Sequence, residues 1–173
     1  SITTCAEFEE LSLWAELSWA GRLELLEGVW LDCAHNRESA DQTLKWLKNH
    51  RDNQPKTPLH LIVGMSADKE ISEVLKRFAE CADRLTFVSP RYPRCVKASD
   101  LLEIYESRVK PLFIRDARAL PHVEIIDELC LALRQRESHA VTLVTGSCFL
   151  VGEARAWLLG VPFPELGVIT TAR

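Results

Sequence analysis

Residues 32–36 carry side chains that could do chemistry. They read Asp-Cys-Ala-His-Asn and directly follow the apolar run 29–31. If that run is a buried strand, the segment forms the loop at its carboxyl end, where open parallel sheets bind ligands. The Asp32 carboxylate could accept hydrogen bonds from ribose hydroxyls, and the His35 imidazole could pack against a base or bond to it. Equally, Asp32 and Asn36 could be helix caps and His35 a polar loop residue, because Asp and Asn favour helix starts for local reasons.

Residues 145–153 form a second segment of this kind. They read Thr-Gly-Ser-Cys-Phe-Leu-Val-Gly-Glu and follow the apolar run 141–145. A turn at Gly146 and Ser147 would place backbone N–H groups and a hydroxyl where they could hold a carboxylate or a phosphate. An ordinary strand-to-helix turn would use the same residues. The segment is not a P-loop, because no Lys-Ser or Lys-Thr follows its second glycine, and the chain lacks a G-x-G-x-x-G fingerprint.

Two further segments carry weaker signals. Arg22 follows Gly21, so its guanidinium could swing from a flexible entry segment onto a phosphate and form two parallel charge-assisted bonds. The alternative is a solvated surface arginine. Residues 64–70, Gly-Met-Ser-Ala-Asp-Lys-Glu, follow the apolar run 59–63. A tight turn at the glycine, with Asp68 capping the next helix, accounts for them.

The elements that must position these residues alternate along the chain. Short apolar runs predict buried strands at 29–31, 59–63, 85–88 and 141–145, with a weaker candidate at 112–114. Apolar residues at helical spacing predict helices after Asn36, over 71–79, after Asp100, over 126–133 with Pro121 near the start, and from near Gly152. The runs do not alternate with polar residues, which is typical of parallel strands covered on both faces. The order predicts an α/β, Rossmann-like domain with a mostly parallel sheet and helices on both faces.

Composition limits the classes of function. The chain has 173 residues, of which 47% are hydrophobic, and this fits one globular domain. It has 21 Lys and Arg against 25 Asp and Glu, and a net charge of −4 argues against nucleic-acid binding. No run approaches the ~20 apolar residues that span a membrane. The six cysteines show neither a C-x-x-C pair nor zinc-like spacing, so we expect a reduced, cytoplasmic protein without a metal site in this chain.

The two ends of the chain are expected to differ. Apolar residues at Phe8, Leu11, Trp14 and Leu17 predict an amphipathic helix. We expect residues 1–20 to form a connecting helix, residues 21–173 to form the main domain, and the polar run 49–58 to be a loop. The single methionine is the internal Met65, so a native start is missing and the chain is expected to be a fragment.

Four motifs in a fixed order resemble one family. They are Gly-Arg-Leu-Glu at 21–24, Asp-x-Ala-His-Asn at 32–36, Ala-Asp-Lys-Glu at 67–70, and Val-Thr-Gly-Ser at 144–147 followed by Leu-Val-Gly-Glu at 150–153. The set covers nearly the whole chain from Gly21 onward. It is similar to the C-terminal domain of folylpolyglutamate synthase and its bifunctional dihydrofolate synthase relatives, in the Mur ligase superfamily. The chain departs from the family pattern at Ala20 and Arg37, where Pro is usual, and at Cys33, where Gly or another small residue is common.

The resemblance implies an ATP-dependent ligase that adds glutamate to a folate through an acyl phosphate. It implies a partner, the protein's own N-terminal ATPase domain, which is absent from this chain and would hold the P-loop and Mg²⁺. It assigns the ATP contacts to Arg22, Asp32, His35 and Asn36. Of these, Arg22 and His35 would act in catalysis, and Ser147 would hold the incoming glutamate. It also implies that the isolated domain is inactive.

Three other functions fit parts of the pattern. Another Mur-type ligase, for example one acting on a cell-wall precursor, would share the fold and the nucleotide contacts, although the Asp-x-Ala-His-Asn and Thr-Gly-Ser pair favours the folate branch. The changes at Cys33 and Arg37 suggest a non-catalytic relative that binds a partner. The fold alone suggests a nucleotide-cofactor oxidoreductase or a methyltransferase, but fold is a poor guide to function and no Gly-rich first turn is present.

Overall fold

A single mixed sheet organises the domain. The computed structural model describes residues 19–51, 57–67 and 70–163. Within them the strands lie in the order β1-β2-β6-β3-β4-β5. Their bounds are β1 Glu24–Leu26, β2 Val29–Asp32, β3 Leu59–Val63, β4 Arg84–Phe87, β5 His122–Ile125 and β6 Val141–Thr145. β1 is antiparallel to β2, and every other neighbouring pair is parallel. The strand order places β6, the last described strand in sequence, in the middle of the sheet.

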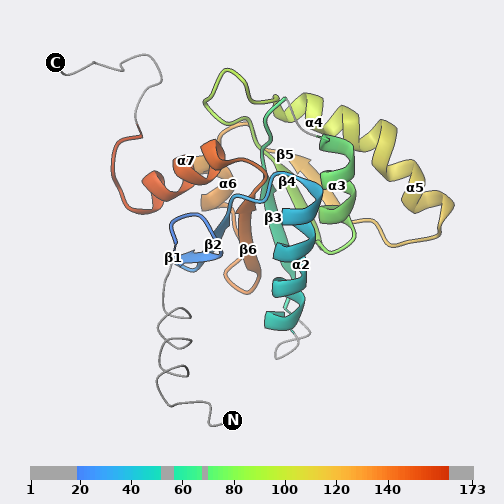
Figure 1. Ribbon diagram of the computed structural model, residues 1–173, viewed down its shortest axis with the longest axis horizontal. Helices are drawn as coiled ribbons and strands as arrows, with labels where there is room; N and C mark the ends of the chain where they lie inside the picture. Colours follow the sequence, from blue (N-terminus) through green and yellow to red (C-terminus); the bar gives the residue numbers. More distant parts are fainter. Residues whose placement is uncertain (1–18, 52–56, 68–69, 164–173) are drawn as a thin grey trace, which may run out of the picture.

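Helices cover both faces of this sheet (Figure 1). They are α2 Arg37–Arg51, α3 Ile71–Ala79, α4 Ala98–Ile104, the π-helical turn η1 Tyr105–Val109, α5 Lys110–Arg115, α6 Leu129–Arg134 and α7 Cys148–Leu158. The helices α2 to α5 pack on one face around Leu61 and Phe87. On the other face α6 and α7 pack around Ile62 and Val144. The predicted α/β fold, with a mostly parallel sheet between two helical layers, is therefore confirmed.

The predictions that rest on complete apolar patterns agree best with the structure. All four of the stronger strand predictions are confirmed within one residue. β3 is buried along its whole length, as a strand covered on both faces should be. The helix predicted over 71–79 is α3, and the five residues of its apolar stripe are all buried: Ile71, Val74, Leu75, Phe78 and Ala79.

The strand predicted at 112–114 is wrong, because these residues lie in α5. The helix that begins at Ala98 continues through η1 to Arg115 and buries Tyr105, Val109 and Phe113 at intervals of four. Pro111 has no N–H to donate, and the π-helical turn before it accommodates that loss inside a longer helix. A three-residue apolar run cannot distinguish a strand from such a helix by periodicity.

The region after Pro121 also differs from the prediction. The residues that follow it form the edge strand β5, and α6 begins only at Leu129, so the helix predicted over 126–133 is shorter and Pro121 does not start it. β5 has exposed or half-buried residues throughout, since it lies at the edge of the sheet. Its apolar pattern is correspondingly weak.

Several elements begin or end at residues other than those predicted. The last helix starts at Cys148, earlier than the predicted start near Gly152, because Ser147 caps it. Helix α2 runs to Arg51, so the loop predicted from Asn49 begins later. The three-residue strand β1 was not predicted. The helix predicted over 1–20 and the cap predicted at Asp68 lie outside the described residues, apart from Trp19 and Ala20.

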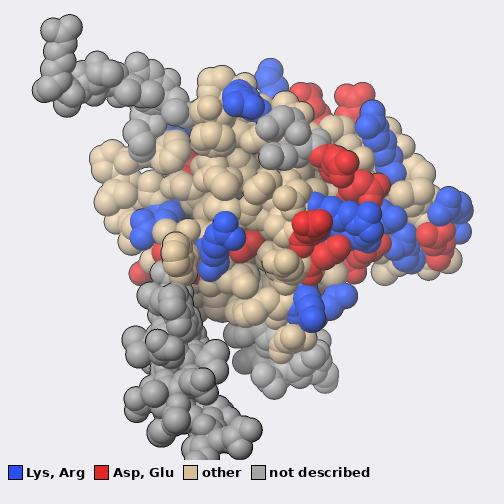
Figure 2. Space-filling model, viewed as in Figure 1, with Lys and Arg blue, Asp and Glu red and all other residues tan. Residues whose placement is uncertain are grey.

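The surface carries mixed charge. Figure 2 shows Lys and Arg interspersed with Asp and Glu on the face in view, with no field of a single sign. Nucleic-acid binding would need clustered positive charge, and this face does not present it. In the described part of the chain, no helix combines the length and the apolar character needed to cross a membrane.

Candidate active site

A cavity of about 250 Å³ lies at the carboxyl end of β2, against the first turns of α2. Its lining includes Arg22, Asp32 and His35, together with Gln42 and Thr43 from α2. Three of the predicted site residues are therefore brought together, from a turn before β1, from the end of β2 and from the loop that follows. This is the edge of the sheet where a doubly wound fold binds ligands.

Arg22 presents an available positive charge. Its side chain is exposed at the cavity, and its guanidinium makes no hydrogen bond or ion pair with any described residue. A guanidinium without an internal carboxylate partner can bind an incoming phosphate or carboxylate through two parallel bonds.

Asp32 is only 9% exposed and binds the chain around it. Its Oδ1 accepts hydrogen bonds from the Ala34 N–H at 3.0 Å and the Thr43 hydroxyl at 2.7 Å. Its Oδ2 accepts one from the Leu23 N–H at 3.0 Å. Each carboxylate oxygen can accept two bonds, so Oδ2 keeps one position for a ligand hydroxyl. Asp32 thus joins the Arg22 turn, the loop after β2 and helix α2.

His35 has a defined tautomer. Its Nδ1 lies 2.8 Å from the carbonyl oxygen of Cys33. A carbonyl oxygen can only accept, so Nδ1 carries the proton and donates it. In the neutral ring Nε2 is then an acceptor at the cavity, able to receive a hydrogen bond from an amine or a hydroxyl of a ligand.

Asn36 lies outside the cavity lining, at the start of α2. Its Oδ1 accepts the Ser39 N–H at 2.9 Å, while the Ser39 hydroxyl oxygen accepts the Asn36 N–H at 3.2 Å. This reciprocal pair is a capping box, and it satisfies N–H groups that a helix end leaves free. The cap that the sequence allowed is confirmed, whereas nucleotide binding by Asn36 stays a prediction.

Ser147 lies at the same edge of the sheet but is buried. Asp32 of β2 pairs with Thr145 of β6, which places the two loops side by side. The Ser147 side chain is 2% exposed, and its Oγ accepts the Phe149 N–H at 3.2 Å as the N-cap of α7. Ser66, after β3, lies 3.4 Å from it, oxygen to oxygen. Glutamate binding by Ser147 also stays a prediction.

Cys33, which lines the cavity, does not make a nucleophile. Burial, followed by a hydrogen bond with Cys148, raises the pKa of the Cys33 thiol to about 12. Since the thiolate is the reactive form, Cys33 is inert at neutral pH. None of the described cysteines forms a disulfide. Among the described residues, no three His, Cys, Asp or Glu side chains are arranged so that they could hold a metal ion.

The contribution of α2 to the cavity was not predicted from the sequence. Ser39, Gln42 and Thr43 recur at i, i+3 and i+4 and therefore share one face of the helix. A polar stripe on the first half of a helix that is otherwise packed on a sheet was a usable signal. It would have indicated that this end of α2 faces a ligand site.

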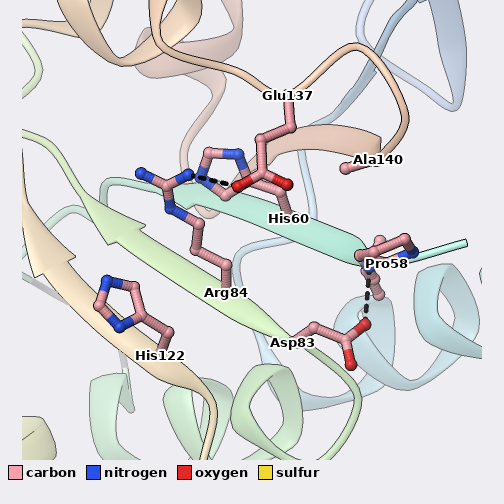
Figure 3. A pocket seen from close by; sticks show the side chains of 8 residues that line it. Pro58, His60, Asp83, Arg84, His122, Glu137 and Ala140 are labelled. Carbon is pink, nitrogen blue, oxygen red and sulfur yellow. Dashed lines mark hydrogen bonds and ion pairs between the residues drawn. The ribbon is translucent and has the colours of Figure 1, made fainter.

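A second cavity, of about 360 Å³, lies at the opposite edge, where β3, β4 and β5 begin. Figure 3 shows Arg84 and Glu137 meeting beside His60. Arg84 is bound by Glu124 at 2.7 Å and by Glu137 at 3.2 Å, so its charge is already neutralised. His60 is 2% exposed, and its Nε2 is 2.7 Å from the Thr86 hydroxyl. The cavity offers no unpaired cation comparable with Arg22.

The buried His60 predicts a stability that depends on pH. Burial, assisted by the Arg84 charge, lowers the pKa of His60 to about 4 from a usual 6.5. Between pH 6.5 and about 4, His60 is protonated in the unfolded chain but stays neutral in the folded chain. We expect the contribution of His60 to the free energy of unfolding to fall from pH 6.5 to about 4, by at most ~1.4 kcal/mol per pH unit, and that contribution to level off below pH 4.

Urea unfolding of the wild type and of His60→Gln between pH 4 and 7.5 measures this slope. His122→Gln is the matched control, because His122 lies at the same cavity but has a side chain that is 70% exposed. The wild type and His122→Gln should lose stability in parallel, and His60→Gln should lose less. Equal slopes in all three proteins would contradict a neutral, buried His60.

Comparisons with known proteins agree with this fold. The chain is 26% identical over 141 residues to the dihydrofolate synthase/folylpolyglutamate synthase of Bacillus subtilis, which covers 80% of this chain and 30% of that protein. The structure of folylpolyglutamate synthase from Thermotoga maritima superposes with a TM-score of 0.70 at 27% identity, covering 87% of this chain and 33% of the other.

A third relative shows the same fold. It is the bifunctional folylpolyglutamate synthase/dihydrofolate synthase from Yersinia pestis, complexed with AMPPNP and a Mn ion, with a TM-score of 0.62 and 23% identity. The match covers 83% of this chain and 32% of that one. The chain thus spans about a third of the length of these relatives. The family model for the C-terminal domain of dihydrofolate synthetase matches residues 24–157. The chain therefore belongs to the family of dihydrofolate synthetase C-terminal domains.

Proposed function

We propose that this chain is the nucleotide-facing domain of an ATP-dependent ligase that joins glutamate to a folate. The observation that carries the proposal is the cavity at the end of β2, where the guanidinium of Arg22, unpaired among the described residues, lies with Asp32 and His35. A cation, a hydrogen-bond acceptor and a carboxylate around one cavity suit the phosphates and the ribose of a nucleotide. The family to which the chain belongs supports the choice of a folate as the acid substrate.

The reaction proposed is amide formation through an acyl phosphate. The folate carboxylate takes the γ-phosphoryl group of ATP, the glutamate amine attacks the acyl carbon, and phosphate leaves. Arg22 would stabilise the charge that grows on the transferring phosphoryl group. His35, with Nε2 as its acceptor, would bind an amine or hydroxyl of a substrate. Asp32 would use the free position on Oδ2 for a ribose hydroxyl.

Two further contacts are proposed with their constraints. Asn36 would reach the nucleotide through its side-chain NH₂, because its side-chain oxygen Oδ1 caps α2. Ser147 would hold the glutamate through its hydroxyl proton, since the oxygen caps α7. Because Ser147 is buried, this contact needs the first turn of α7 to open when substrates bind.

The rest of the catalytic apparatus is proposed to lie in another domain of the same protein. That ATPase domain would carry the P-loop and the Mg²⁺ site, and closure of this domain over it would exclude water from the acyl phosphate. The relative from Yersinia pestis was solved with a nucleotide analogue and a divalent metal. The described cysteines form no disulfide, which is consistent with our proposal of a reducing, cytoplasmic location.

A ligation assay tests the proposal. The whole protein, with its ATPase domain, should release ADP and phosphate when given ATP, glutamate and either dihydropteroate or tetrahydrofolate, compared side by side. The 173-residue chain alone should show no turnover, because it lacks the P-loop. Nucleotide binding by the whole protein without ligation would indicate a non-catalytic relative. Ligation that is inhibited by a UDP-sugar peptide, and not by a folate, would indicate a cell-wall ligase.

A further inference from the structure

Arg22 sits at the tip of a turn with an unusual backbone. Gly21 has a φ of +71° and Leu23 a φ of +49°, so both neighbours of Arg22 are left-handed. Glycine adopts this region freely, but a leucine there is strained. Such a conformation persists only where surrounding contacts hold it. The contacts that hold this turn therefore determine where the Arg22 side chain projects.

Two carboxylates hold the backbone on either side of Arg22. The Gly21 N–H donates to Glu24 Oε2 at 2.9 Å, and the Leu23 N–H donates to Asp32 Oδ2 at 3.0 Å. The Gly21 carbonyl accepts the Cys33 N–H at 2.8 Å. The turn is thus fixed at both ends while the Arg22 side chain stays exposed.

Glu24 connects this turn to helix α7. It is 8% exposed, and its two oxygens accept from Arg155 Nε at 3.0 and 3.2 Å. Gly21 also packs on α7, since a Cβ built at Gly21 would lie 2.9 Å from Val151 Cγ1. Helix α7 therefore holds the turn twice, by an ion pair and by close packing.

We propose that Glu24 and Arg155 are positioning residues that aim Arg22 at a phosphate group of the bound nucleotide. The inference rests on the function proposed for Arg22. Glu24 does not line the cavity, and its oxygens bind Arg155 and the Gly21 N–H. Without Glu24, the Gly21 N–H and the Arg155 guanidinium lose their partner. The strained turn then relaxes and the Arg22 side chain spreads over several directions.

The main test uses two glutamates on matched ion pairs. Glu153 of α7 is also 8% exposed and binds Arg91, through its Nε at 3.3 Å and its N–H at 3.1 Å, but has no link to the Arg22 turn. In the whole ligase, Glu24→Ala should lower kcat about tenfold, since small misplacements of a positioned group are costly. Glu153→Ala should leave kcat within about twofold, although both variants remove a buried glutamate from its ion pair with an arginine.

A double-mutant cycle identifies the route of the effect. If Glu24 acts through Arg22, Glu24→Ala should cause no further loss of kcat in an Arg22→Ala background. Glu24→Gln should recover most of the activity, because its amide oxygen can still accept the Gly21 N–H. Losses of kcat that multiply in the double variant would overturn the proposal. If Glu24→Ala does not fold, Arg155→Ala supplies the cycle, since the Arg155 side chain is 42% exposed and its removal leaves the core intact.

Amide hydrogen exchange on the 173-residue chain gives a readout that needs no activity. The Gly21 amide should exchange at least about tenfold faster in Glu24→Ala than in the wild type or in Glu153→Ala. Unchanged exchange at Gly21 would overturn the positioning role alone. Wild-type turnover by Arg22→Ala would instead overturn the proposed function of Arg22, and the catalytic consequence of the Glu24 link with it.

Discussion

Under the proposed function, replacing Arg22 by alanine is expected to lower the turnover of the whole protein by about 10²–10³-fold. The guanidinium is exposed at the cavity and makes no hydrogen bond or ion pair with a described residue. Its charge is therefore free to meet the charge that develops on the transferring phosphoryl group. The measurement is steady-state release of ADP at saturating ATP, glutamate and folate.

Arg22→Lys is the control for geometry. Lysine keeps the charge but cannot form two parallel bonds, so its turnover should lie between those of the wild type and Arg22→Ala. The unfolding midpoint of the 173-residue chain should barely change in either variant, because the side chain is exposed and makes no ion pair with the part of the chain that the structure describes. Full turnover in Arg22→Ala would show that this guanidinium does not bind the reacting phosphate.

Replacing Gly146 by alanine is expected to destabilise the domain by at least ~3 kcal/mol. Gly146 follows the central strand β6 with a φ of +104°, a conformation that other residues rarely adopt. A Cβ there would lie 2.7 Å from the carbonyl oxygen of Gly64, at the end of the neighbouring strand β3. Backbone of two central strands would have to separate, and a flexible side chain could not absorb the clash. Urea unfolding of the 173-residue chain measures the loss.

Gly28→Ala is the matched control for this substitution. Gly28 also has a positive φ, +74°, but nothing lies within 4 Å of a Cβ built there. It should cost only the ~1–2 kcal/mol of a left-handed alanine. If the two alanine variants lose the same stability, then the close approach of β3 and β6 contributes nothing, and the larger effect predicted for Gly146 is wrong.

The parts of the fold that the sequence predicts are those with complete local patterns. Residues 59–63 and 71–79 repeat apolar residues at the period of a buried strand and of an amphipathic helix, and both are confirmed. The edge strands β1 and β5 are short and half-exposed, so they lack such a pattern. At 112–114 a short apolar run belongs to a helix whose buried face is evident only together with Tyr105 and Val109.

Only the part of the site that follows from the strand topology could be predicted from the sequence. Because parallel strands end at one edge, Asp32 and His35 could be placed in one crevice from their positions after a strand. The bond from the Leu23 N–H to Asp32 and the pair between Glu24 and Arg155 join residues 9 and 131 positions apart. Local sequence patterns do not predict contacts between residues that are far apart in the chain. These contacts explain why Asp32 binds its own chain as well as lining the cavity.

The position of β6 also constrains how the protein is made. β2 and β3 lie on either side of β6, which is the last of the described strands to leave the ribosome. Until residues 141–145 emerge, the nascent chain holds two apolar strands with open edges that face each other across a gap. The sheet can close only late in synthesis, and a product cut short before Val141 would expose both edges to other chains. In the cell, we therefore expect this domain to be either completely folded or prone to association with other chains.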